Sequence, residues 1–246
     1  MALGGVCPIK ALKQMNNHYA EHSYSYQGQD LFVLEVLGGI RGGYFLDSGA
    51  SNGISGSNSR LLELSFGWTG ICIEPNDATF RDLVRNRSCI CLNCCLYDRE
   101  GPIDFIEEAG VFGGIVQEYD PQHLRFTQHV LGDRWPEGEG PPTVRKHTRT
   151  LRSVLREAAA PAVIDYWSLD TEGSELAILK SFPFDEYRFR VLTVEHNEGP
   201  AREDIRQFLE GRGYTRVRVL GIDDGYVWNG ELPSRSWRSA AWRTGR

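Results

Sequence analysis

Short apolar runs alternate with helical patterns along most of this 246-residue chain, from Tyr44 onward. Each apolar run is long enough for one strand, and each helical stretch is long enough to cross over a sheet of parallel strands. We expect strands at 43–47, 70–74, 89–96, 103–107, 162–170, 191–196 and 215–220, with a partner for the last near 226–228. Helices are expected at 58–66, 78–85, 151–159, 174–180 and 201–212. The pattern predicts a Rossmann-like α/β fold, with a central, mostly parallel sheet flanked by helices.

Two segments lie outside this alternation. Residues 1–40 show helical spacing in two pieces, the second over 30–37, and predict an N-terminal helical cover. Residues 108–150 are rich in glycine and proline, and connections of that length are commonly functional lids or disordered links. We interpret 108–150 as a substrate lid within a single domain of residues 1–246, a length that suits one domain.

A glycine-rich turn follows the first expected strand, within the sequence YFLDSGASNG. Its small residues let the backbone approach a ligand where open α/β sheets bind ligands, at the carboxyl end of the strand. Twenty-seven positions after Asp47 the next strand ends at Glu74, which can accept hydrogen bonds from both hydroxyls of an adenosine ribose. Asp47 would repel a pyrophosphate and attract an α-amino group, which favours S-adenosylmethionine (SAM) over a nicotinamide dinucleotide. The alternative is a tight turn with only a structural role. The predicted cofactor residues here are Asp47, Gly49, Ala50, Ser51, Asn52, Gly53, Glu74 and Pro75.

Acidic residues also end two later strands, as Asp170 and Glu172 after one and Glu195 at the end of the next. Parallel strands bring their carboxyl ends to the same edge of a sheet, so these carboxylates should face the cofactor together. Oxygen ligands suit a hard divalent ion such as Mg²⁺, with His196 and Asn197 completing or supporting the site. His196 is the first candidate for the base that deprotonates an acceptor, because its ordinary pKa lies near neutrality, and Asp170 is the second. Helix capping and direct substrate binding without metal are the alternatives for Asp170 and Glu172.

Seven segments, in order, resemble the FkbM family of SAM-dependent methyltransferases over about residues 25–198. They are QGQDLFV, YFLDSGASNG, GWTGICIEPN, LYDREG, RTLRSVL, VIDYWSLDTEGSELAILK and LTVEHN. The resemblance implies that Asp47, Gly49, Asn52, Gly53 and Glu74 hold the cofactor. It further implies that Asn76, Asn93, Leu96 and Asp98 lie near the adenine, and that Gln27 and Gln29 cover the cofactor. Asp170 is a further predicted cofactor-binding residue.

We therefore expect a SAM-dependent O-methyltransferase acting on a hydroxyl of a small molecule, such as a natural product or a sugar. The catalytic candidates are His196, Asp170 and Glu172, and the metal candidates are Asp170, Glu172, Glu195, His196 and Asn197. Methylation of nitrogen, or of a peptide or protein, is the alternative within the same chemistry. A nicotinamide-dependent oxidoreductase and a SAM-binding module without activity are the alternatives of another class.

Charge and composition limit the partners. The formal net charge of −6 disfavours a main role in neutralising nucleic acid, and no apolar stretch is long enough to cross a bilayer. We expect a cytoplasmic protein whose partner is a small-molecule acceptor, and the sequence leaves its oligomeric state open, homo-oligomers included. Four crowded cysteines in CICLNCC do not have zinc-site spacing and are expected to be buried, reduced thiols. The Arg- and Trp-rich C-terminal stretch is expected to pack on the domain or on another subunit.

Overall fold

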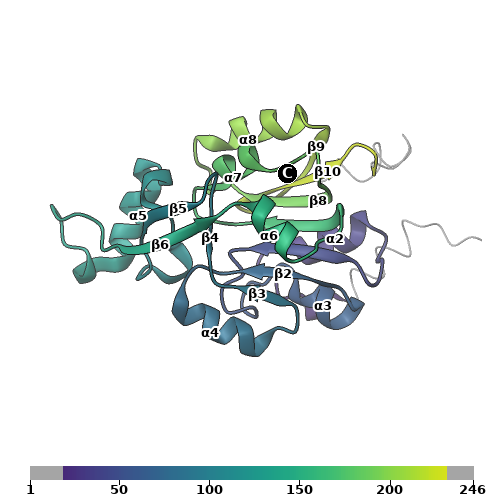
Figure 1. Cartoon of the computed structure of the whole chain (residues 1–246), viewed down its shortest axis with the longest axis horizontal. Helices are drawn as coiled ribbons and strands as arrows, with labels where there is room; N and C mark the ends of the chain where they lie inside the picture. The colour runs from purple at the N-terminus through teal and green to yellow at the C-terminus, as the bar shows by residue number, and fades with distance from the viewer. Residues whose placement is uncertain (1–18, 232–246) are drawn as a thin grey trace, which may run out of the picture.

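A seven-stranded sheet forms the centre of the molecule in the computed structural model, which describes residues 19–231 (Figure 1). Its strand order is β3-β2-β1-β7-β8-β10-β9. The bounds are β1 Tyr44–Ser48, β2 Thr69–Ile73, β3 Ile90–Leu92, β7 Val163–Leu169, β8 Arg188–Glu195, β9 Tyr214–Leu220 and β10 Asp223–Trp228. Strand β10 is antiparallel to both neighbours, whereas β3, β2, β1, β7 and β8 pair in parallel. The predicted Rossmann-like α/β fold with a mostly parallel sheet is confirmed.

Helices cover both faces of this sheet. On one face pack α2 (Gln29–Val36), α3 (Arg60–Phe66) and α4 (Asp77–Asn86), whose buried side chains include Phe32, Leu62 and Leu83. On the other face pack α6 (Leu151–Glu157), α7 (Glu175–Ser181) and α8 (Ala201–Glu210). Short polar residues fix where some of these helices begin: the Asn76 side chain accepts hydrogen bonds from two backbone N–H groups of α4. The helices thus support, from both faces, the edge of the sheet at which strands β1, β2, β7 and β8 end.

A second, three-stranded sheet departs from the sequence expectation. Its order is β4-β6-β5, with β4 at Cys95–Leu96, β5 at Gly101–Phe105 and β6 at Val144–Arg149. The single strand expected over 89–96 is therefore two strands in two sheets. The break falls at Asn93, whose side chain donates hydrogen bonds to the backbone carbonyls of Glu74 and Pro75 and so diverts the chain between β3 and β4.

The segment 108–150 is more regular than expected. It contains helix α5 (Pro121–Leu131) and strand β6, besides short 3₁₀ turns at Gly110–Phe112, Val116–Glu118 and Gly132–Arg134. Asp120 caps α5 and Pro121 occupies its first turn, which are standard signals for a helix start that glycine and proline elsewhere in the segment obscured. Helix α5, β5 and β6 lie together beside the central sheet, at the left of Figure 1. Its role as a substrate lid stays a prediction.

The N-terminal cover is described from Tyr19 onward, with a 3₁₀ turn at Ala20–His22 before α2. The first of the two predicted helical pieces lies largely outside the described residues, as does the Arg- and Trp-rich C-terminal stretch. The polar link before α2 is folded around the buried Asp30 carboxylate, which accepts hydrogen bonds from the Ser23 and Ser25 hydroxyls. Within residues 19–231, no helix combines the length and apolar character needed to span a bilayer.

Candidate active site

A cavity of about 690 Å³ opens where strands β1, β2, β7 and β8 end. Its wall includes the glycine turn after β1, the N-terminal cover, and residues 110–113 and 115 of the 108–150 segment. Phe112 lines the cavity, whereas Tyr119 is outside its wall and donates a hydrogen bond to the Phe112 carbonyl. Of the predicted site residues, those lining the cavity are Gln27, Gln29, Asp47, Gly49, Ala50, Ser51, Asn52, Glu74, Pro75, Leu96, Asp170, Glu172 and Glu195. Those outside its wall are Gly53, Asn76, Asn93, Asp98, His196 and Asn197.

The turn after β1 approaches the end of β7 so closely that residue 49 must be glycine. Gly49 has a φ of +84°, and a Cβ there would overlap the Asp170 carbonyl oxygen and lie 3.0 Å from the carbonyl carbon. Gly53, with a φ of +75°, packs on Arg87, since a Cβ there would lie 2.7 Å from Cγ of that residue. The turn is therefore packed between the backbone of Asp170, just after β7, and the side chain of Arg87.

Glu74 is oriented by the turn itself. The Ser51 N–H donates to Oε2 and the Asn76 N–H to Oε1, both at 2.8 Å. Burial raises the pKa of Glu74, and these hydrogen bonds oppose that rise. Each carboxylate oxygen has two lone pairs, so the group can still accept hydrogen bonds from ribose hydroxyls.

The residues implied to lie near the adenine are only partly gathered there. Leu96 lines the cavity beside the buried Cys94 and Cys95. The Asn76 side chain caps α4 and donates to the Glu107 carbonyl, and the Asn93 amide serves the chain break described above. Asp98 is exposed and ion-paired with Arg99. Asn76, Asn93 and Asp98 therefore lie around the cavity and not in its wall.

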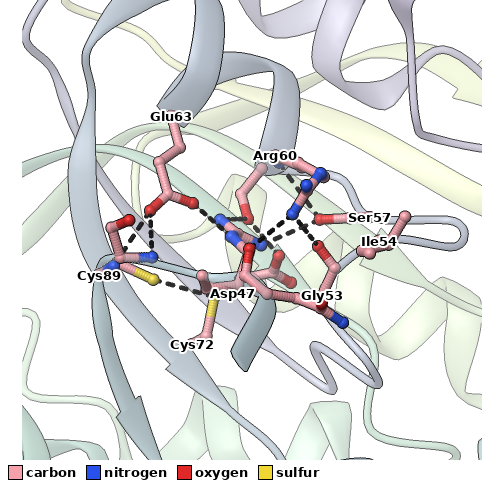
Figure 2. A network of polar contacts seen from close by, with 12 residues as sticks. Asp47, Gly53, Ile54, Ser57, Arg60, Glu63, Cys72 and Cys89 are labelled. Atoms are coloured by element: carbon pink, nitrogen blue, oxygen red, sulfur yellow. Dashed lines mark hydrogen bonds and ion pairs between the residues drawn. The ribbon is translucent and has the colours of Figure 1, made fainter. Parts of the chain in front are cut away.

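Asp47 is buried and already has partners. Its Oδ2 accepts a hydrogen bond from the Ser59 hydroxyl, and Arg87 donates to the same hydroxyl at 2.9 Å. Burial raises the pKa of the Asp47 carboxyl, while the nearby Arg87 charge lowers it. Figure 2 shows Asp47 within this network below the turn, together with Gly53, Ser57 and Glu63. The attraction of an α-amino group to Asp47 stays a prediction. The carboxylate concerned already accepts a hydrogen bond from Ser59.

Three predicted carboxylates meet at one point of the cavity. One oxygen each of Asp170, Glu172 and Glu195 lies within 4.8 Å of the other two. Burial raises the pKa of Asp170 and of Glu195 well above their ordinary values, and repulsion from Glu172 adds to both rises. Glu195 Oε2 is buried without a hydrogen-bond partner. Such a cluster requires a cation, shared protons or a donor from a ligand to be stable.

His196 and Asn197 differ from this cluster in position. The Asn197 side-chain amide donates to Glu172 Oε2 at 3.4 Å and so supports the cluster from outside. His196 faces the layer beneath α8: its Nδ1 accepts the Glu198 N–H at 2.9 Å, and its buried Nε2 lies 3.8 Å from Asp224 Oδ1. The structure does not bring His196 to the cavity, because it follows Glu195 directly and side chains alternate between the faces of a sheet.

Two polar residues at this end of the cavity, Asp223 and His123, were not predicted from the sequence. Asp223 pairs in register with Glu195 across β10 and β8, lines the cavity, and accepts a hydrogen bond from Gln29 Nε2 at 2.7 Å. Burial raises the pKa of Asp223 to about 6. His123 of α5 contacts Glu172 Oε2 through Nε2 at 3.1 Å. The Asp223 signal was the pair DD before the expected strand at 226–228, whereas His123 had none, because its helix was not expected.

Basic side chains between residues 145 and 152, in β6 and at the start of α6, pair with the protein's own acidic groups. Lys146 contacts Asp77 and Glu107, and Arg145, Arg149 and Arg152 likewise form ion pairs with carboxylates. These side chains belong to the surface of the second sheet and of α6, and they are not gathered at the cavity.

Comparisons with known proteins place this site in a family. Among curated proteins, no sequence matches this one. The similar solved structures include a TehB-like SAM-dependent methyltransferase from Corynebacterium glutamicum, with 11% identity, a TM-score of 0.40, and coverage of 89% of this chain and 97% of that one. A human methyltransferase 10 domain containing protein has 12% identity, a TM-score of 0.45, and coverage of 93% and 98%. The N-terminal domain of human METTL16 in complex with SAH has 12% identity, a TM-score of 0.40, and coverage of 92% and 72%. The methyltransferase FkbM domain matches residues 47–216, more than half of the chain, on a fold of the class I methyltransferase type, and the chain therefore belongs to the FkbM family of SAM-dependent methyltransferases.

Proposed function

We propose that this protein transfers the methyl group of SAM to a hydroxyl of a small molecule, such as a natural product or a sugar, with a divalent cation orienting the acceptor. The observation that carries the proposal is the meeting of Asp170, Glu172 and Glu195 at the end of the SAM cavity. Three carboxylates offer hard oxygen ligands of the kind that Mg²⁺ binds.

The residues present suit a cation. The Glu195 Oε2 atom is buried without a partner, and burial, with repulsion from neighbouring carboxylates, raises the pKa of Asp170 and of Glu195. A divalent ion would be held by these two residues and Glu172, and it would lower the pKa of a bound acceptor hydroxyl. Asn197 would then steady Glu172 through its side-chain amide.

The protein's own residues perform the remaining tasks. Methyl transfer from a sulfonium is an in-line displacement, so the acceptor oxygen must be held behind the methyl group and lose its proton. We assign the proton-accepting role to Asp223 instead of His196, because Asp223 lines the cavity beside Glu195 and His196 does not. Gln29 holds the Asp223 carboxylate in place from the N-terminal cover.

Mg²⁺ titration of the full chain by calorimetry tests the cation site. We expect binding to the wild-type protein and its loss in Glu195→Gln, with SAM binding retained in both. Asp104→Asn is the matched control, since Asp104 is an exposed carboxylate paired with Arg145 far from the cluster. Equal Mg²⁺ affinity in wild type and Glu195→Gln would remove the cation from the proposal.

Mass spectrometry of candidate acceptors incubated with SAM tests the reaction itself. A gain of one methyl group on a hydroxyl, lost on addition of a chelator while SAM still binds, is the expected result. Transfer to an amine, or to a peptide side chain, would instead support the other acceptor classes. Binding of a reduced nicotinamide dinucleotide but not SAM would contradict the proposal entirely.

A further inference from the structure

Two thiols lie side by side beneath the SAM turn, which is the glycine-rich turn 49–53 after β1 that we propose to bind SAM. The sulfur atoms of Cys72 and Cys89 are 3.5 Å apart, and no disulfide joins them. Cys72 belongs to β2, pairs in register with Asp47 of β1 and is fully buried. Cys89 immediately precedes β3 and is only half-buried. Figure 2 shows both sulfurs beside Asp47 and Glu63.

The surroundings favour reaction at Cys89 first. Contacts with the Cys72 thiol and the neighbouring Cys91 thiol, together with the Arg87 charge, lower the pKa of Cys89, whereas burial raises the pKa of Cys72. The thiolate is the reactive form of cysteine, and oxidation follows thiolate character and exposure. Cys89 therefore has the features of the attacked sulfur, and Cys72 those of the resolving one.

The same residues are linked to the cofactor turn. The backbone N–H groups of Ser88 and Cys89 donate to Glu63 Oε1, and the other oxygen of Glu63 pairs with Arg87. Arg87 in turn donates to the Ser57 hydroxyl at 3.1 Å and to that of Ser59, which holds Asp47. A displacement of Cys89 is thus transmitted through one ion pair to the base of the turn.

A disulfide would require such a displacement. The S–S bond is about 2.05 Å long, so the two sulfurs must approach by about 1.5 Å. Cys72 sits in a strand paired on both sides, whereas Cys89 lies just outside β3 and is the sulfur free to move.

We propose that Cys72 and Cys89 form an oxidative modification site, at which hydrogen peroxide converts the two thiols to a disulfide and so weakens SAM binding. In the first step the Cys89 thiolate attacks the peroxide O–O bond, which gives a sulfenic acid at Cys89 and, with one proton, water. In the second step the Cys72 thiol displaces hydroxide from that sulfur, which forms the S–S bond and a second water. The peroxide is reduced by two electrons and the thiol pair is oxidised by two.

The experiment treats the full chain with hydrogen peroxide, then maps thiols by alkylation and peptide mass spectrometry and measures SAM affinity by calorimetry. We expect a 72–89 cross-link and about tenfold weaker SAM binding, equivalent to losing one or two positioning hydrogen bonds, with full recovery after dithiothreitol. Cys89→Ser should retain its SAM affinity after peroxide. Cys91→Ser is the matched control, because it removes a neighbouring half-buried thiol and should still form the cross-link.

Other outcomes overturn the inference. Absence of the 72–89 cross-link in folded protein, or a cross-link that uses Cys91, refutes the site. A cross-link with unchanged SAM affinity refutes the coupling to the turn. The mapping does not depend on SAM, so failure of the reduced protein to bind SAM would count against the assigned methyltransferase function and leave the thiol result to be judged separately.

Discussion

Replacement of Arg87 by methionine isolates the charge network under the SAM turn. The Arg87 side chain is wholly buried, and its partner Glu63 is 10% exposed. The methionine leaves the buried carboxylates of Glu63 and Asp47 without their cation, because Asp47 depends on the same guanidinium through Ser59. Breaking a buried pair from one side costs about 3–5 kcal/mol, a large fraction of a typical free energy of unfolding.

Urea unfolding followed by circular dichroism measures this loss. The double variant Glu63→Gln with Arg87→Met should recover at least about 1 kcal/mol relative to Arg87→Met alone, since the glutamine oxygen can still accept from Ser88 and Cys89. Arg85→Met is the matched control, because Arg85 pairs with Asp82 at the surface and should cost under about 1 kcal/mol. If Arg87→Met costs no more than Arg85→Met, the guanidinium does not hold the turn.

Three further changes test the cavity. Gly49→Ala should weaken SAM binding at least about tenfold in calorimetry, because the methyl group overlaps the Asp170 carbonyl and the positive φ is retained. Asp223→Asn should gain stability over the wild type as pH rises from about 4 to 7, by about 3 kcal/mol in urea unfolding with chelator present, since the pKa of Asp223 rises from 3.8 to about 6 on folding. Glu195→Gln should raise the melting temperature of chelator-treated protein at neutral pH, because it removes one of three mutually repelling charges.

The direction of each measured change distinguishes the expected result from its alternative. The folded pKa of Asp223 lies above its unfolded value, so its contribution to stability is complete below about 4 and is lost as pH passes about 6. A gap between Asp223→Asn and wild type that narrows over this range contradicts the burial of an ionised carboxylate. A lower melting temperature for Glu195→Gln in chelator indicates that the carboxylates share protons instead of repelling. Unchanged SAM affinity in Gly49→Ala shows that the turn can shift away from β7.

The sequence was most informative where strand order alone determines position. Asp170, Glu172 and Glu195 end neighbouring parallel strands, and their meeting follows from that topology. His196 shows the limit of placing residues by strand end alone: it follows Glu195 directly, so the two side chains face opposite sides of the sheet. Alternation along the strand therefore predicts that the His196 side chain points away from that of Glu195.

Other features depend on contacts that no local pattern reveals. The Asn93 break is set by a hydrogen bond to a carbonyl nineteen residues earlier in sequence, so the run 89–96 read as one strand. Asp223 joins the site because β10 begins three residues earlier than its apolar pattern suggested. Within 108–150, by contrast, Asp120 and Pro121 were local signals for the start of α5, whereas strand β6 depends on its pairing with β4 and β5.

The close approach of Gly49 to Asp170 couples the glycine-rich turn after β1 to the proposed first ligand of the divalent ion, because a Cβ at residue 49 would overlap the Asp170 carbonyl oxygen. A shift of the turn cannot leave Asp170 in place, because no space for independent movement separates the two backbones. Linkage then requires reciprocity: if SAM changes the affinity for a divalent ion by some factor, the ion changes the affinity for SAM by the same factor.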